Sequence, residues 1–171
     1  GRPGTRAQMN TLAAQLGVAL HAHGMMLATA ESCTGGGVAS AVTEIAGSSA
    51  WFERGFVTYS NQAKVEMLGV SNITLARFGA VSEATVREMV EGALRNSQAQ
   101  ISLAVSGIAG PGGGTADKPV GTVWFAWGIK DGVSVARLHH LAGDRTEIRS
   151  QAVGIAMQGV LELLGKVSEI A

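Results

Sequence analysis

Short apolar runs alternate with segments of helical periodicity along this chain. Apolar residues at three- and four-residue spacing predict a first helix that ends near Gly24: Met9, Leu12, Ala13, Leu16 and Leu20. Residues 25–30 then form a short apolar run that predicts a buried strand, and residues 35–45 return to helical spacing. A strand, a turn and a helix in this order indicate an α/β fold.

The alternation continues to the end of the chain. Further strands are predicted over residues 56–59, 101–105, 123–129 and 133–141. Further helices are predicted after Asn61, after an N-cap at Ser82, and from a cap at Asp144 to a stop at Gly165. The pair Asp131-Gly132 predicts a tight turn that makes the last two strands antiparallel. We therefore expect a three-layer α/β/α sandwich whose mixed sheet contains an antiparallel hairpin and is covered by helices on both faces.

Length and composition narrow the class of protein. We expect a single domain over residues 6–171, because 46% hydrophobic residues are enough for one sizeable core, and we set residues 1–5 aside as a cloning remnant or a trimmed start. Thirteen Lys and Arg balance thirteen Asp and Glu, which disfavours nucleic acid as a partner. No apolar run is long enough to cross a membrane, and the single cysteine, Cys33, fits a reducing cytoplasm.

The most informative segment is residues 30–36, Ala-Glu-Ser-Cys-Thr-Gly-Gly. It lies where a predicted strand ends and a helix begins, which is where ligands collect in open α/β sheets. Backbone N–H groups at a helix N-terminus can stabilise an oxyanion, so Ser32 is a natural nucleophile. Spacing alone leaves open that Ser32 or Thr34 only caps the helix. Cys33 is a rival nucleophile, or a small apolar filler.

A nucleophilic serine needs a base, and Lys64 is the better candidate. A partly buried lysine can lose its charge and accept the serine proton, although most lysines on short helices are solvated. The histidines are His21, His23, His139 and His140. Their spacing does not make the usual zinc motifs, so we expect no metal site.

Residues 106–115 are too rich in glycine and proline for a helix or strand, and we expect a functional loop there. Common nucleotide signatures are absent from the sequence. Thr115 stands where a dinucleotide fingerprint needs its third glycine, and no Gly-Lys-Ser or Gly-Lys-Thr occurs. The lipase-type motif fails around Ser106, where Ala104 and Ile108 occupy the glycine positions.

Four blocks in order resemble the CinA carboxy-terminal family. They are residues 30–36, Tyr59-Ser60-Asn61 with Lys64, residues 107–115 with 118–122, and Gly143-Asp144-Arg145. The resemblance implies a nicotinamide-nucleotide amidase that converts nicotinamide mononucleotide and water to nicotinic acid mononucleotide and ammonia, with no cofactor. It implies that Ser32 attacks the carboxamide carbon, that Lys64 takes and returns the proton, and that Tyr59 or Thr34 orients or relays it.

The glycines and two side chains are expected to hold the substrate, because backbone amides and Arg bind ribose or phosphate oxygens. The candidates are Gly35, Gly36, Gly107, Gly110, Gly112, Gly113, Gly114, Thr115 and Arg145. Spacing alone also allows Arg145 a surface ion pair. The alternative function is a non-catalytic nucleotide-binding module that recruits a partner, whereas the glycine-rich loop disfavours a purely structural oligomerisation domain.

Three tryptophans stand out in a chain with only 5% aromatic residues. Trp51, Trp124 and Trp127 predict apolar surface that is buried between subunits, and hence a homo-oligomer. The alternative is that these side chains fill the core.

Overall fold

A five-stranded mixed sheet forms the centre of the computed structural model, which describes residues 5–170. The strands are β1 (Leu27–Glu31), β2 (Phe52–Val57), β3 (Ile101–Gly107), β4 (Thr122–Ile129) and β5 (Ser134–His140). Their order across the sheet is β2-β1-β3-β4-β5. β1 is parallel to β2 and β3, whereas β4 is antiparallel to β3 and β5. The predicted hairpin is thus confirmed.

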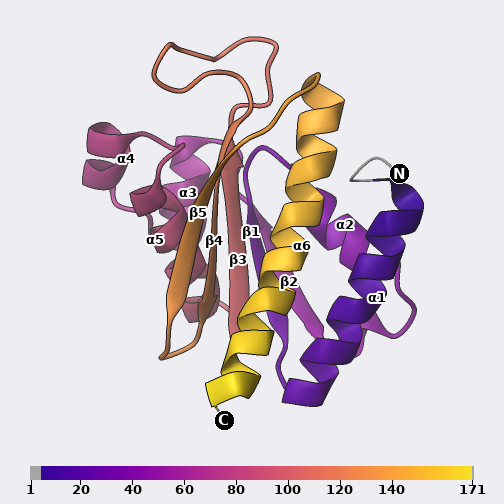
Figure 1. The fold of residues 1–171 in the computed structure, drawn as a ribbon. Helices are drawn as coiled ribbons and strands as arrows, with labels where there is room; N and C mark the ends of the chain where they lie inside the picture. Colours follow the sequence, from indigo (N-terminus) through magenta and orange to yellow (C-terminus); the bar gives the residue numbers. More distant parts are fainter. Residues whose placement is uncertain (1–4, 171) are drawn as a thin grey trace.

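Helices cover both faces of the sheet (Figure 1). One layer contains α1 (Arg6–His23), α2 (Gly37–Thr43) and α6 (Arg145–Ile170). The other contains α3 (Asn61–Leu68), α4 (Asn72–Phe78) and α5 (Glu83–Arg95), and a 3-10 turn, η1 (Ser48–Ala50), precedes β2. This arrangement confirms the predicted three-layer α/β/α sandwich. No helix of the described residues is long and apolar enough to span a membrane.

Alternation along β1 divides the core into two clusters. Leu27 packs with side chains of α1 and α6, whereas Ala28 and Ala30 pack with the apolar face of α5. Because both faces of the sheet are covered, all five residues of β1 are buried.

Short polar caps set the starts of several helices. The Thr5 hydroxyl accepts from the amide of Gln8, so this residue, set aside in the sequence with residues 1–4, begins α1. Residues 1–4 lie outside the described part. The Ser82 hydroxyl caps α5, and the Asp144 carboxylate accepts from the amide of Glu147 in the first turn of α6. Both of these caps were predicted.

The bounds of two predicted elements were wrong, and one helix was missed. β2 spans residues 52–57 rather than the predicted 56–59, because Glu53 and Arg54 hide its apolar pattern. α4 was not predicted, since this short helix buries none of its side chains. α6 continues past Gly165 to Ile170, because an exposed helical glycine costs only about 1 kcal/mol relative to alanine.

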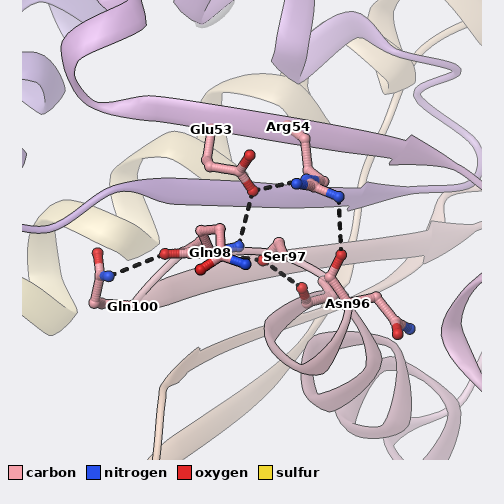
Figure 2. Close-up of polar contacts among 8 residues, drawn as sticks. Glu53, Arg54, Asn96, Ser97, Gln98 and Gln100 are labelled. Carbon is pink, nitrogen blue, oxygen red and sulfur yellow. Dashed lines mark hydrogen bonds and ion pairs between the residues drawn. The ribbon is translucent and has the colours of Figure 1, made fainter.

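Polar contacts explain the charged edge strand β2. Figure 2 shows that the Glu53 carboxylate accepts from Arg54 Nε at 2.7 Å and from the amide of Gln98 at 3.0 Å. The Arg54 guanidinium donates to the carbonyl of Asn96 at 3.1 Å. The two residues thereby fasten the connection between α5 and β3 to the edge of the sheet.

Two of the three tryptophans fill the core. Trp51 is 6% exposed and lies against Gly17, where a Cβ would come within 2.6 Å of its ring. Trp127 is 2% exposed, and its Nε1 donates to the carbonyl of Ala156 at 2.8 Å. These two side chains therefore give no support to the predicted homo-oligomer, which stays a prediction.

Candidate active site

The predicted nucleophile lies at the carboxyl end of β1. Glu31 is the last residue of that strand, and the amide of Ser32 continues the pairing by donating to the carbonyl of Val105 in β3 at 2.9 Å. On the other side, the amide of Thr58 donates to the carbonyl of Glu31 at 2.8 Å. The loop 108–121 and the start of α6 rise from this same end of the sheet (Figure 1). The site therefore lies where parallel strands end, as expected.

Lys64 meets Ser32 inside the protein. Lys64 lies on α3, the helix that follows β2. The side chain of Lys64 is only 1% exposed. Its Nζ donates to Ser32 Oγ at 2.9 Å, and to the carbonyls of Thr58 at 2.9 Å and Tyr59 at 3.2 Å. The solvated alternative for this lysine is thus excluded.

Burial makes the neutral form of Lys64 easier to reach than it is for an exposed lysine. Burial lowers the pKa of Lys64 from 10.5 to about 8. It forms no ion pair with any residue in the described part of the chain. A neutral amine has two N–H groups and one lone pair. In this structure Nζ donates to Ser32 Oγ, and that hydroxyl donates to the carbonyl of Tyr59 at 3.4 Å. In the neutral form the two N–H groups match the carbonyls of Thr58 and Tyr59, and the lone pair can accept the hydroxyl proton of Ser32.

The backbone after Ser32 makes a tight turn, and we call residues 32–36 the nucleophile turn. The amide of Gly35 donates to the carbonyl of Ser32 at 3.0 Å. Gly35 and Gly36 have φ of 58° and 99°, a region that other residues rarely adopt. The amides of Cys33 and Thr34 donate to no oxygen of the described residues, so they are candidate donors to a ligand oxygen.

The amides at the start of α2 are already occupied. Glu31 is 1% exposed, and its carboxylate accepts from the amides of Val38 at 2.8 Å and Ala39 at 3.0 Å. It also accepts the hydroxyl of Thr34 at 2.6 Å. The expectation that the helix N-terminus itself supplies oxyanion donors is therefore wrong. The hydroxyl of Thr34 points to Glu31 rather than to Ser32 or Lys64.

Tyr59 contributes to the pair through its backbone rather than its ring. Its carbonyl accepts from Lys64, whereas its side chain is 61% exposed. The phenol oxygen accepts from Arg145 Nη2 at 3.2 Å, and Arg145 Nη1 donates to the carbonyl of Gly110 at 2.8 Å. Arg145 thus joins Tyr59 to the glycine-rich loop, in place of the surface ion pair that spacing also allowed.

Hydrogen bonds hold the glycine-rich loop at a few points. Gly110 and Gly113 have positive φ, and Gly112, Gly113, Gly114 and Thr115 are exposed. Thr115 closes a turn in which its hydroxyl accepts from the amide of Lys118 at 2.9 Å. Lys118 Nζ donates to the carbonyl of Phe78 at the end of α4 at 2.8 Å. Gly107, by contrast, packs against Val123, where a Cβ would come within 2.6 Å.

Cys33 is a poor candidate for the nucleophile. Its side chain is 6% exposed, and burial raises the pKa of its thiol to about 11. The reactive thiolate is therefore scarce at neutral pH, which favours the packing alternative. The described residues contain no cluster of three or more His, Cys, Asp or Glu side chains that could hold a metal ion.

Sequence reasoning missed two residues that contact the nucleophile turn. Glu31 is part of the informative segment but was not singled out. Arg149 donates from Nε to the carbonyl of Cys33 at 3.0 Å and from Nη2 to that of Thr34 at 3.3 Å. One signal was present in the sequence, since Arg149 lies four residues after Arg145 and so shares its helix face.

The fold and the site define an α/β protein with a buried serine–lysine pair, an arrangement suited to acyl transfer. The chain belongs to the CinA C-terminal domain family, whose model matches residues 9–164. This confirms the family resemblance found in the sequence.

Similar proteins cover nearly the whole chain. "Nicotinamide-nucleotide amidohydrolase PncC" of Escherichia coli (strain K12) is 54% identical over 154 residues, 90% of this chain and 93% of that protein. A "CinA-like protein" of Akkermansia muciniphila is 51% identical over 135 residues, which are 79% of this chain and 33% of that longer protein. The crystal structure of competence/damage inducible protein CihA from Agrobacterium tumefaciens has a TM-score of 0.89 at 48% identity, covering 91% of this chain and 95% of that one.

Proposed function

We propose that this chain is a nicotinamide-nucleotide amidohydrolase that converts nicotinamide mononucleotide and water to nicotinic acid mononucleotide and ammonia. The observation that carries the proposal is the buried 2.9 Å contact between Lys64 Nζ and Ser32 Oγ at the end of β1. The name of the E. coli relative supports the substrate. A relative of the same name in Pseudomonas putida, 50% identical over 91% of this chain, supports it further.

In the first half of the reaction, Ser32 Oγ attacks the carboxamide carbon while its proton passes to the neutral Nζ of Lys64. The tetrahedral intermediate then breaks its C–N bond. Lys64 returns the proton to the departing nitrogen, which leaves as ammonia. An ester between the nicotinoyl carbon and Ser32 Oγ remains.

In the second half, water attacks the ester carbon and gives its proton to Lys64. The bond to Ser32 breaks, Lys64 returns the proton to Ser32 Oγ, and the carboxylic acid that forms loses its proton to water and leaves as a carboxylate. One water is consumed and one ammonia is released. In both halves the carbonyl oxygen becomes negative, and we assign its stabilisation to the free amides of Cys33 and Thr34.

We assign the nucleotide end of the substrate to the rim formed by Tyr59, Arg145 and the glycine-rich loop. A guanidinium has five N–H groups, and the contacts to Gly110 and Tyr59 use two of them. The remaining groups suit a phosphate. Amides of the exposed segment Gly112 to Thr115 are candidates for ribose or phosphate oxygens. Thr34 has a supporting role in this scheme, because its hydroxyl donates to Glu31.

The proposal extends to the setting of the protein. We place it in the cytoplasm as a homo-oligomer with a small-molecule substrate and without nucleic-acid or membrane partners. The lone buried cysteine supports the cytoplasm, and the balanced charge argues against nucleic acid.

The test is the release of ammonia from nicotinamide mononucleotide by the purified protein at neutral pH with excess chelator. We expect nicotinic acid mononucleotide and ammonia in equal amounts. Saturable binding without product would favour the non-catalytic module instead. Loss of activity with chelator, restored by zinc, would refute the metal-free scheme.

A further inference from the structure

The nucleophile turn is held from one side by Glu31. This carboxylate is almost completely buried, and it has no cationic partner among the described residues. Its two oxygens accept the amides of Val38 and Ala39 and the hydroxyl of Thr34. Glu31 therefore joins the end of β1 to both the turn and the first residues of α2. Such a buried charge is stable only while those donors keep their positions.

The opposite side of the turn is held by Arg149 from α6. Its guanidinium donates hydrogen bonds to the carbonyl oxygens of Cys33 and Thr34. In a trans peptide, the C=O of one residue and the N–H of the next point in opposite directions. By fixing the carbonyl of Cys33 toward α6, Arg149 therefore fixes the amide of Thr34 away from α6. This amide is one of the two donors assigned to the oxyanion.

We propose that Glu31 and Arg149 act together as positioning residues, which hold the nucleophile turn so that Ser32 Oγ and the amides of Cys33 and Thr34 keep one fixed geometry. The inference rests on the proposed function. Neither residue is part of the rim assigned to the nucleotide, and each acts on the chemical step through the turn. Their loss lowers kcat while KM is retained, because the rim that binds the nucleotide is left intact.

Glu31→Gln tests the first half, and Glu88→Gln is its matched control. Glu88 lies on α5, and its carboxylate similarly accepts hydrogen bonds from the amide of Ser71 and the hydroxyl of Thr74. These donors lie at the start of α4, away from the nucleophile turn. We expect Glu31→Gln to lower kcat about 10- to 100-fold with KM within about twofold. Glu88→Gln, with a comparable loss of thermal stability, retains kcat. Equal effects of the two variants on kcat would overturn the proposal.

Arg149→Met and Arg149→Lys test the second half, with Arg137→Met as control. Arg137 is a half-exposed arginine of β5 that pairs with Glu162. We expect Arg149→Met to lower kcat about 10- to 100-fold, and Arg149→Lys, which keeps the charge but only one donor nitrogen, to fall between it and the wild type. The double variant Glu31→Gln/Arg149→Met should be little worse than the worse single one. Additive losses, or a wild-type kcat in Arg149→Met, would contradict a joint role.

The rate at which a fluorophosphonate labels Ser32 separates this inference from the proposed function. Labelling requires that the Ser32 hydroxyl and the oxyanion donors be correctly positioned, but it requires no nucleotide. If the wild type labels rapidly but leaves nicotinamide mononucleotide intact, the proposed substrate fails and the positioning role is still measured. Slower labelling of Glu31→Gln and Arg149→Met than of their controls supports that role, and unchanged labelling refutes it. A wild type that neither labels nor turns over refutes both.

Discussion

Replacing Lys64 by methionine should change the pH dependence of stability in a calculable way. The folded protein lowers the pKa of Lys64 from 10.5 to about 8 because it buries the amine. Between these two values the unfolded chain binds more protons than the folded one, so the contribution of Lys64 to stability rises with pH. Below about pH 8 the burial penalty is fully present, and above 10.5 it is gone. Its full size is about 3 kcal/mol at 1.36 kcal/mol per pH unit.

Lys64→Met removes the titrating group and three hydrogen bonds. The hydrogen-bond loss depends little on pH, whereas the burial penalty does. From pH 7 to pH 9.5, the wild type should gain about 2 kcal/mol in free energy of unfolding relative to the variant. The comparison cancels other groups that titrate alike in both proteins.

Urea unfolding of both proteins at the two pH values measures this difference, with equal m-values required. If the difference between wild type and variant does not change with pH, Lys64 titrates normally in the folded state. Its assignment as a base whose neutral form is accessible near physiological pH would then be wrong.

Further predictions concern the rim, α6 and assembly. Arg145→Met should raise KM for nicotinamide mononucleotide about tenfold or more while kcat changes little. The variant should also narrow the difference in kcat/KM between nicotinamide mononucleotide and nicotinamide riboside. Steady-state kinetics on both substrates test this, and an unchanged KM contradicts the phosphate assignment. Gly165→Ala should stabilise the protein by up to about 1 kcal/mol, because nothing lies within 4 Å of the added Cβ, and a lowered melting temperature would refute this. Light scattering at micromolar concentration should show a homo-oligomer, and a monomer would end that prediction.

Local signals in the sequence were enough for most of the fold. Periodicity and capping residues predicted α1 and α5, and an Asp-Gly turn predicted the β4–β5 hairpin, since these patterns act between neighbours in the chain. The bounds of β2 were missed because Glu53 and Arg54 interrupt its apolar pattern and find their partners at residues 96–98. The end of α6 was missed because a single helical glycine costs little.

The site was only partly predictable, because its contacts join distant segments. Motif blocks identified Ser32 and Lys64, but only the fold shows that α3 buries the lysine against the serine. The sequence suggested that Thr34 acts on the proton, whereas its hydroxyl donates to Glu31. Arg149 lies 116 residues from Cys33 along the chain, so its contact with the nucleophile turn has no local signature.

The most direct test of the central claim, that Ser32 attacks and Lys64 activates it, is kcat/KM for nicotinamide mononucleotide in Ser32→Ala, Lys64→Ala and the double variant. Each single change should remove nearly all turnover, and the double variant should be little worse than either, because the two residues act as one unit. Cys33→Ala should keep most activity. Matched thermal transitions must show that the variants are folded. Additive losses, or an active Ser32→Ala beside an inactive, folded Cys33→Ala, would contradict the account.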